Sequence, residues 1–151
     1  MSAQPKRVLF VCIGNACRSQ MAEAFARAYG SDVMIAASAG LAAASRIAPD
    51  TMQAMEQKGL NLSEQFPKSL RHMSRVQFDL VVNMSGMELP EGIKARMVDW
   101  DVPDPLNLDY EEHCEVRDQI ERQVMQLILE LRRESQEPRF RGQGSGPAER
   151  G

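Results

Sequence analysis

Hydrophobic residues along the chain follow two patterns, short continuous runs and stripes that repeat every three or four positions. The run RVLFVC at residues 7–12 is typical of a strand that is buried on both faces. The stripe that follows runs from Met21 to Ala28 and stops at Gly30, which predicts an amphipathic helix. Applied to the whole chain, the two patterns predict strands at 7–12, 32–40, 78–84 and 95–102, and helices at 19–30, 48–59 and 110–134.

The order of these elements indicates the class of fold. Strands that alternate with helices are typical of an open, mostly parallel α/β sheet with right-handed crossovers. In such sheets ligands bind beyond the carboxyl ends of the strands. Because Cys12 is the last residue of the first predicted strand, the loop after it lies where a binding site is expected.

Composition and charge indicate a single globular domain in the cytoplasm. The 151 residues are 43% hydrophobic and 26% charged, with a formal net charge of −3, which gives no sign of nucleic-acid binding. No apolar run has the length of a membrane span. Three cysteines, an odd number, fit a reducing cytoplasm better than a disulfide scaffold. We expect a domain over residues 1–133 and a disordered tail over 134–151, which is rich in glycine, proline and charge.

The segment CIGNACRS, which follows the first strand, has the parts of an oxyanion site. A thiol at Cys12 faces a helix N-terminus, where free N–H groups favour negative charge. Gly14 and Asn15 tolerate positive φ, so the loop can turn its amides inward. Arg18 offers a planar fork for two oxygens, and Ser19 can donate to the thiolate or cap the helix. The alternative is a plain connection in which Cys12 is a small buried hydrophobe.

Transfer of an oxyanion to a cysteine also needs an acid for the leaving oxygen. The segment DWDVPDPLN after the fourth strand offers Asp99, Asp101 and Asp104. Asp104 stands between Pro103 and Pro105, which would hold its loop stiffly and present one carboxyl group. Taken alone, an Asp–Pro pair is also a common turn signal. Together with the cysteine loop, it makes Asp104 the leading candidate for the acid.

These motifs resemble the low-molecular-weight protein tyrosine phosphatase superfamily, which also contains the thioredoxin-type arsenate reductases. The resemblance extends over residues 6–132. It rests on VLFVCIGNACRSQMAEAF at 8–25, SAG at 38–40, FDLVVNM at 78–84 and the pair Asp104–Pro105. It implies a four-stranded parallel sheet flanked by helices on both faces, and a phosphatase-like domain that works without metal or other cofactor.

The resemblance also implies a role for each residue of the site. Cys12 would attack phosphorus to form a cysteinyl phosphate, and Asp104 would protonate the leaving group and then activate water. Ser19 and Ser38 would support the loop and tune the thiolate, as would Asn15. Cys17 matches a loop cysteine that can form a reversible disulfide with Cys12. The residues implied to bind the phosphate are Ile13, Gly14, Asn15, Ala16, Cys17 and Arg18.

The chain departs from the phosphatase branch in the parts that select a substrate. Gln20 stands where phosphatases have proline, and CRSQMAE looks more like the reductase branch, as does PKSL at residues 67–70. No aromatic residue follows SAG, where residues 41–46 read LAAASR, and Leu106 and Asn107 replace the usual tyrosines. A phosphotyrosine ring would therefore lose its stacking partners.

The chain also departs from the reductase branch. Thioredoxin-coupled reductases pass oxidation through two further cysteines after the third strand, where this chain has Ser85 and no cysteine. Cys114 is the remaining thiol and is expected on a helix face. Cys17 or a small external thiol could still resolve an arsenylated Cys12. The supporting histidine of the family has no match, because His72 falls too late in the chain.

The main expectation is therefore a cysteine-dependent phosphomonoester hydrolase whose substrate is a phosphorylated protein or a small phosphomonoester. The first alternative is an arsenate reductase that uses Cys12 with thioredoxin or a small thiol as reductant. The second alternative is a non-enzymatic module that binds oxyanions or senses redox state. None of the three is expected to bind nucleic acid or a membrane.

Overall fold

A four-stranded parallel sheet forms the centre of the protein. The computed structural model describes residues 4–136. The strands are β1 (Lys6–Cys12), β2 (Met34–Gly40), β3 (Leu80–Asn83) and β4 (Arg96–Asp99), in the order β2-β1-β3-β4. β1 pairs with β2 along its whole length, so that Cys12 lies opposite Gly40. Cys12 is therefore at the carboxyl edge of a central strand.

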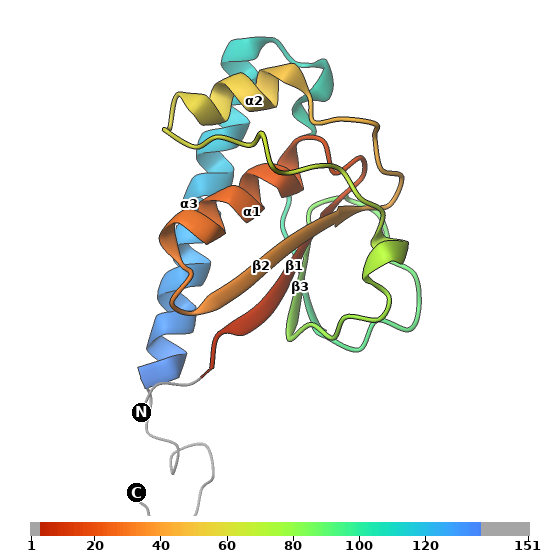
Figure 1. Ribbon diagram of the computed structural model, residues 1–151, viewed down its shortest axis with the longest axis vertical. Coiled ribbons are helices and arrows are strands. Elements are labelled where there is room, and N and C mark those ends of the chain that lie inside the picture. Colours follow the sequence, from red (N-terminus) through yellow and green to blue (C-terminus); the bar gives the residue numbers. More distant parts are fainter. Residues whose placement is uncertain (1–3, 137–151) are drawn as a thin grey trace, which may run out of the picture.

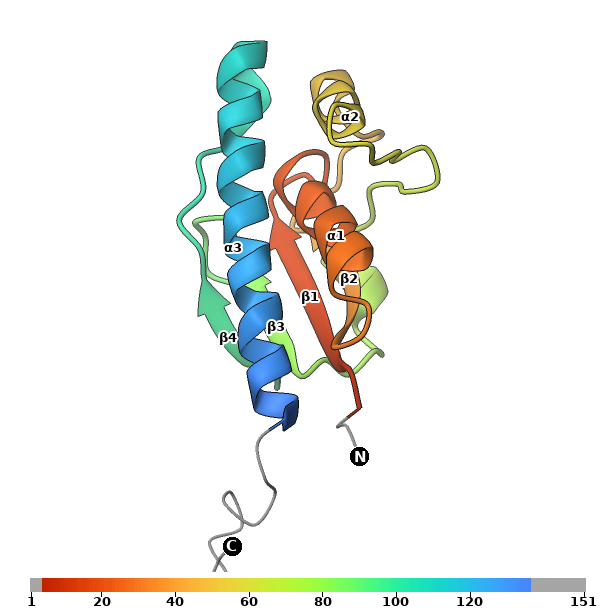
Figure 2. The same ribbon diagram turned by 90° about the vertical axis from the view of Figure 1, so that its left-hand side faces the viewer.

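The helices are distributed unequally around this sheet. The α-helices are α1 (Arg18–Tyr29), α2 (Pro49–Glu56) and α3 (Tyr110–Gln136), and the 3₁₀-helices are η1 (Leu70–Met73) and η2 (Pro105–Asn107). α1 and α3 lie side by side over one face of the sheet (Figure 2). α2 packs against the first part of α3, beyond the carboxyl ends of the strands, and η1 lies on the opposite face (Figure 1).

The alternation of side chains along β1 divides the core into two parts. Val8 and Phe10 belong to the larger cluster, which contains the buried faces of α1 and α3. Leu9 and Val11 belong to a small cluster on the other face, which is covered by η1 and irregular segments rather than by an α-helix. The hydrophobic stripe of α3 in the larger cluster comprises Val116, Ile120, Val124, Leu127, Ile128 and Leu131.

The predicted fold class, a four-stranded parallel α/β sheet flanked by helices, is confirmed. The helices were expected on both faces, but α1 and α3 cover the same face and the other face carries only the short helix η1 among the described residues. Strands β3 and β4 are both shorter than predicted. β4 is shorter because the chain leaves the sheet after Asp99 and continues as the loop that carries Asp104. α3 extends to Gln136, so residues 134–136 of the predicted tail are helical. Residues 137–151, the rest of that tail, lie outside the described residues. Over residues 4–136 no helix is both long enough and apolar enough to cross a membrane.

Candidate active site

The loop at residues 12–18 connects β1 to α1 with its carbonyl groups facing away from the site. Four of these carbonyls accept hydrogen bonds of 2.8–3.1 Å from amides of the segment after β2. The pairs are Cys12 with Leu41, Ile13 with Ala42, Gly14 with Ala44, and Ala16 with Ala48. Within the described residues, none of the backbone amides of residues 13–18 donates to a protein acceptor. The loop thus presents a set of free N–H groups at a helix N-terminus, which is an arrangement that binds anions.

Asn15 gives the loop its curvature. Its φ of 51° makes it the one non-glycine residue with positive φ in the described chain. Gly14, for which the sequence also suggested positive φ, does not adopt it. The Asn15 side chain is fully buried, and its Oδ1 accepts from the Lys68 amide and from Gln20 Nε2, both at 3.0 Å. These contacts hold a backbone conformation that asparagine tolerates better than most residues.

Gly40 allows β2 to end directly against this loop. A Cβ atom at residue 40 would lie 2.7 Å from the Ile13 carbonyl oxygen and 2.8 Å from the Asn15 amide nitrogen. Both neighbours are backbone atoms, which cannot move aside as a flexible side chain could. The glycine of the SAG motif is therefore required by close packing.

Cys12 is buried, and its sulfur lies 2.9 Å from Ser19 Oγ. Asn15 Nδ2 donates to the same Ser19 oxygen at 2.7 Å. Because that oxygen already accepts a hydrogen bond from Asn15, its own proton is free to point at the sulfur. Ser19 thus contacts the thiol, as the sequence suggested, and it does not cap α1, which begins one residue earlier.

Arg18 joins the loops that follow β3 and β4. Its guanidinium group is buried, and Nη1 donates to the carbonyl oxygens of Met84 and Val102. Nη2 lies 3.5 Å from Asp104 Oδ2. The guanidinium is therefore fixed at the carboxyl edge of the sheet, between Cys12 and the loop after β4.

Asp104 occupies the partly exposed side of this cluster. Its side chain is 47% exposed, and Oδ1 accepts the Leu106 amide at 3.1 Å as the N-cap of η2. The structure thus brings Cys12, Arg18 and Asp104 together, although 86 positions separate Arg18 from Asp104 in the chain. Asp99 ends β4, and the side chain of Asp101 is not among the contacts of Arg18 in the described residues.

Ser38 lies on β2, two residues before Gly40. Its hydroxyl donates to Glu23 Oε1 at 2.5 Å. The buried Glu23 carboxylate also pairs with Arg27 at 2.8 Å and lies 4.0 Å from Lys68 Nζ. Burial lowers the pKa of Lys68. Ser38 therefore contacts a buried carboxylate, and its influence on Cys12 would be indirect.

Gln20 is the residue of the site whose role the sequence did not predict. It is fully buried, and its Nε2 donates to the Asn15 carbonyl oxygen and to Phe66 O at 3.1 and 3.0 Å. Gln65 Nε2 donates to Gln20 Oε1 at 2.6 Å. The departure from proline at this position was visible in the sequence, but its partners come from a distant segment.

The two other cysteines lie in different environments. Cys17 is buried, and burial raises the pKa of its thiol from 9.0 to about 11, against a smaller lowering of this pKa by the Thr51 hydroxyl. Cys114 is on α3, with its sulfur 3.7 Å from Gln57 Oε1. All three cysteines are free thiols in the structure. No group of three or more His, Cys, Asp or Glu side chains in residues 4–136 is arranged to hold a metal ion.

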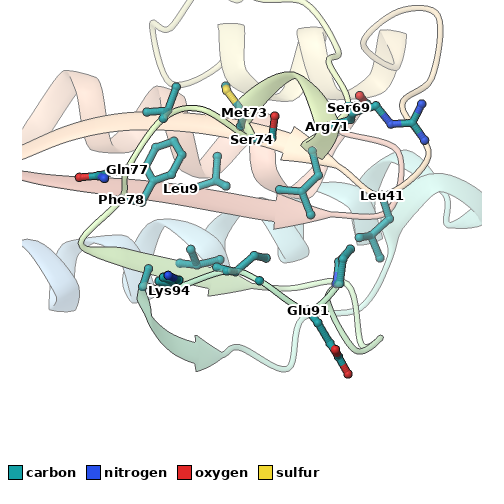
Figure 3. Close-up of a pocket in the computed structure, with 17 residues that line it drawn as sticks. Leu9, Leu41, Ser69, Arg71, Met73, Ser74, Gln77, Phe78, Glu91 and Lys94 are labelled. Carbon is teal, nitrogen blue, oxygen red and sulfur yellow. The ribbon is translucent and has the colours of Figure 1, made fainter.

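A large groove of about 990 Å³ opens on the face of the sheet opposite α1 and α3 (Figure 3). Leu9 and Val81 form its floor, and η1 and the segment 90–95 form its walls. None of Cys12, Arg18 or Asp104 lines it. The groove is therefore separate from the 12–18 loop.

A parallel α/β sheet with a cysteine–arginine loop at its carboxyl edge defines a class of enzymes that transfer oxyanions through a cysteine. The family model described as low molecular weight phosphotyrosine protein phosphatase matches residues 7–137. The chain belongs to this family, as the sequence motifs suggested.

Its relatives within the family include both reductases and phosphatases. A glutaredoxin arsenate reductase from Synechocystis is 33% identical over 130 residues, which are 83% of this chain and 98% of the relative. The solved structure of an arsenate reductase in the phosphate binding state has a TM-score of 0.77 at 33% identity, with the same coverage. The YwlE arginine phosphatase from Geobacillus stearothermophilus has a TM-score of 0.74 at 26% identity, covering 86% of this chain and 95% of that one. Two of these three relatives are arsenate reductases and the third is a phosphatase.

Proposed function

We propose that the protein is an arsenate reductase in which Cys12 is the nucleophile and an external thiol is the reductant. The observation that carries the proposal is the set of free amides at residues 13–18 around the buried sulfur of Cys12. This arrangement fits a tetrahedral oxyanion held against the sulfur. The 33% identity to a glutaredoxin arsenate reductase supports arsenate as that oxyanion.

In the first step the Cys12 thiolate attacks arsenic. A sulfur–arsenic bond forms and an arsenic–oxygen bond breaks, and the oxygen leaves as water with a proton supplied by Asp104. Arg18 and the loop amides hold the remaining oxygens. Arsenic stays pentavalent in this step.

The second step reduces arsenic. A thiol attacks the Cys12 sulfur, a disulfide forms, and the electron pair of the sulfur–arsenic bond stays on arsenic, which leaves as arsenite. A second thiol then releases Cys12 from the mixed disulfide. Two thiols become one disulfide, which accounts for the two electrons that arsenic gains.

The positions of the cysteines support an external reductant. The pKa of Cys17, raised to about 11 by burial, keeps it protonated and unreactive at neutral pH. After β3, the side chain of Ser85 donates to Asn83 Oδ1 at 2.6 Å, where a relay cysteine would stand. Cys114 hydrogen-bonds Gln57, the residue directly after α2. A glutaredoxin with glutathione, or a thioredoxin, would therefore supply both thiols.

The test is arsenate-dependent oxidation of NADPH, coupled through glutathione, glutaredoxin and glutathione reductase, or through thioredoxin and its reductase. We expect turnover that Cys12→Ser abolishes and that Cys17→Ser and Cys114→Ser retain. Asp104→Asn should lower kcat by about 10²–10⁴-fold, as expected for loss of an acid. Absence of arsenate-dependent oxidation with either reductant would contradict the proposal.

Phosphomonoester hydrolysis is the second candidate function. The position of Asp104, 3.5 Å from Arg18, favours it, because hydrolysis uses the same carboxyl twice, first as acid and then as base. Activity on p-nitrophenyl phosphate that is lost in Cys12→Ser would support this function. Binding of phosphate without turnover of either substrate would instead indicate a non-enzymatic module.

A further inference from the structure

The backbone of residue 68 bonds both the 12–18 loop and the end of β2. The Lys68 amide donates to Asn15 Oδ1 at 3.0 Å. The Lys68 carbonyl oxygen accepts from the Gly40 amide at 2.9 Å. The position of this residue therefore affects the loop directly, and what holds Lys68 in place matters for the site.

The side chain of Lys68 is enclosed by three groups. Its Nζ donates to the Phe66 carbonyl oxygen at 3.1 Å and lies 4.0 Å from Glu23 Oε1 on α1. The ring of Phe66 lies on another side of the ammonium group, with its centroid 5.0 Å from Nζ. The Glu23 side chain is only 3% exposed, and a buried carboxylate strongly favours a nearby cation. The ammonium group thus closes a turn over residues 66–68 and draws that turn toward α1.

Asn15 connects Lys68 to the sulfur of Cys12. Its Oδ1 has two donors at 3.0 Å, the Lys68 amide and Gln20 Nε2. With Oδ1 held in this way, Nδ2 of the same amide group donates to Ser19 Oγ at 2.7 Å. Ser19 Oγ lies in turn 2.9 Å from the Cys12 sulfur. A shift of Lys68 would therefore loosen the amide group of Asn15 and, through it, the hydroxyl group that faces the sulfur.

We propose that Lys68 is a positioning residue whose ammonium group holds residues 65–68 against the 12–18 loop, and so fixes Asn15 in the conformation that binds the oxyanion. The proposal rests on the proposed function in one respect, since it takes this loop as the oxyanion site. The ammonium group faces Glu23 and the Phe66 carbonyl oxygen. Lys68 therefore acts through Asn15 and not on the oxyanion itself.

Two variants separate the charge of Lys68 from its bulk. Lys68→Met keeps most of the length of the side chain and removes the charge and the hydrogen bond to Phe66. Lys68→Arg keeps the positive charge and has donors for both Glu23 and the Phe66 carbonyl oxygen. We expect Lys68→Met to impair the loop and Lys68→Arg to preserve it.

Lys58→Met is the matched control. Lys58 also pairs with a glutamate, since its Nζ lies 2.8 Å from Glu121 Oε1 on α3. Among the hydrogen bonds and ion pairs of residues 4–136, neither partner of this pair reaches the 12–18 loop. The control therefore removes a lysine–glutamate pair of closer approach and leaves the surroundings of Asn15 intact.

The first measurement is the affinity for inorganic phosphate by titration calorimetry. We expect Lys68→Met to bind phosphate about tenfold more weakly, as when a hydrogen bond to a charged group is lost. Lys68→Arg and Lys58→Met should bind it as the wild type does. Wild-type affinity in Lys68→Met would overturn the proposal, and so would an equal loss of affinity in Lys58→Met.

The pH dependence of this affinity separates the charge of Lys68 from a merely structural role. Burial lowers the pKa of Lys68, and of the charged groups on α1 that act on it, Glu23 opposes this shift and Arg27 adds to it. The ammonium group is therefore half lost at a pH below 10.5, the ordinary value for lysine, while the guanidinium of Lys68→Arg stays charged. Between neutral pH and pH 10.5, the wild type should lose phosphate affinity relative to Lys68→Arg. A constant ratio of the two affinities over this range would contradict the role of the charge.

A third measurement needs neither turnover nor phosphate. The Nδ2 protons of Asn15, one of which donates to Ser19, can be followed by NMR through their exchange with solvent. Lys68→Met should speed this exchange, whereas Lys68→Arg and Lys58→Met should leave it unchanged. Unchanged exchange in Lys68→Met would overturn the proposal. If the wild type reduced no arsenate, the proposed function would fail while the exchange of the Asn15 amide still decided the role of Lys68.

Discussion

The side chain of Gln20 donates from one nitrogen to both oxygens of Asn15, the carbonyl oxygen at 3.1 Å and Oδ1 at 3.0 Å. Asn15 is also the residue with positive φ at the turn of the 12–18 loop. Gln20 thus fixes the conformation on which the direction of the loop amides depends. A proline at this position could make neither bond.

Replacing Gln20 with leucine should weaken the loop without changing the volume of the side chain greatly. The buried carbonyl oxygen of Asn15 would lose its donor and the part-buried carbonyl oxygen of Phe66 would lose one of two donors, so we expect a loss of about 1–3 kcal/mol of unfolding free energy. Phosphate affinity, measured by calorimetry, should fall with it. Gln126→Leu, at an exposed position of α3, is the control and should leave both quantities unchanged. Unaltered phosphate affinity in Gln20→Leu would show that the loop keeps its conformation without the hydrogen bonds of Gln20.

Gly40→Ala should damage the site by steric conflict. The new Cβ would lie 2.7–2.8 Å from backbone atoms of Ile13 and Asn15, and overpacking of this kind typically destabilises by about 1–3 kcal/mol. Thermal or urea unfolding measures the loss. At Gly14 an added Cβ would meet its nearest atoms only at 3.8 Å, so Gly14→Ala should be far less destabilising. Equal stability of the two variants would argue against the close approach of β2 to the loop.

Arg18→Lys should lose hydrogen bonds of the site although it keeps the positive charge. The planar guanidinium contacts Met84, Val102 and Asp104 at once, which a single ammonium group cannot reproduce. We expect kcat/KM to fall by about 10²–10³-fold, as when a donor that stabilises the transition state is removed. Arg122→Lys, at an exposed position of α3, should be silent in the same assay. Full activity of Arg18→Lys would show that only the positive charge matters.

The Cys17 thiol should make stability depend on alkaline pH. Its pKa is raised from 9.0 to about 11 in the folded protein, so the unfolded chain loses this proton first as the pH rises. The contribution is intact below pH 9 and is lost progressively up to about pH 11. The total loss of unfolding free energy over this window is about 2–3 kcal/mol. Unfolding by urea at several pH values measures it. Cys17→Ala should flatten the decline in that window and Cys114→Ala should not, whereas identical pH profiles would contradict the burial argument.

The grouping of the candidate site residues could be predicted largely because it is local. Cys12, Arg18 and Ser19 lie within one loop and the first turn of one helix, and the Asp–Pro pair has its own local signal. The partners of Gln20 could not be predicted, since Gln65 and Phe66 reach it only after residues 65–68 fold back over the loop. The periodicity of the chain likewise predicts the strands but does not show that α1 and α3 cover the same face of the sheet. The boundary of the domain at residue 133 and the tail remain predictions.

The segment after β2 holds the loop in place with hydrogen bonds from its main chain. Four of its amides, at Leu41, Ala42, Ala44 and Ala48, bond the loop carbonyls, while the side chains of residues 42–46 are exposed. The side chains of residues 42–46 are therefore free to diverge between homologues, whereas proline, which lacks the amide hydrogen, is excluded at those four positions. A stretch that would look unconserved in side chains would still be under selection for the hydrogen on its backbone nitrogen.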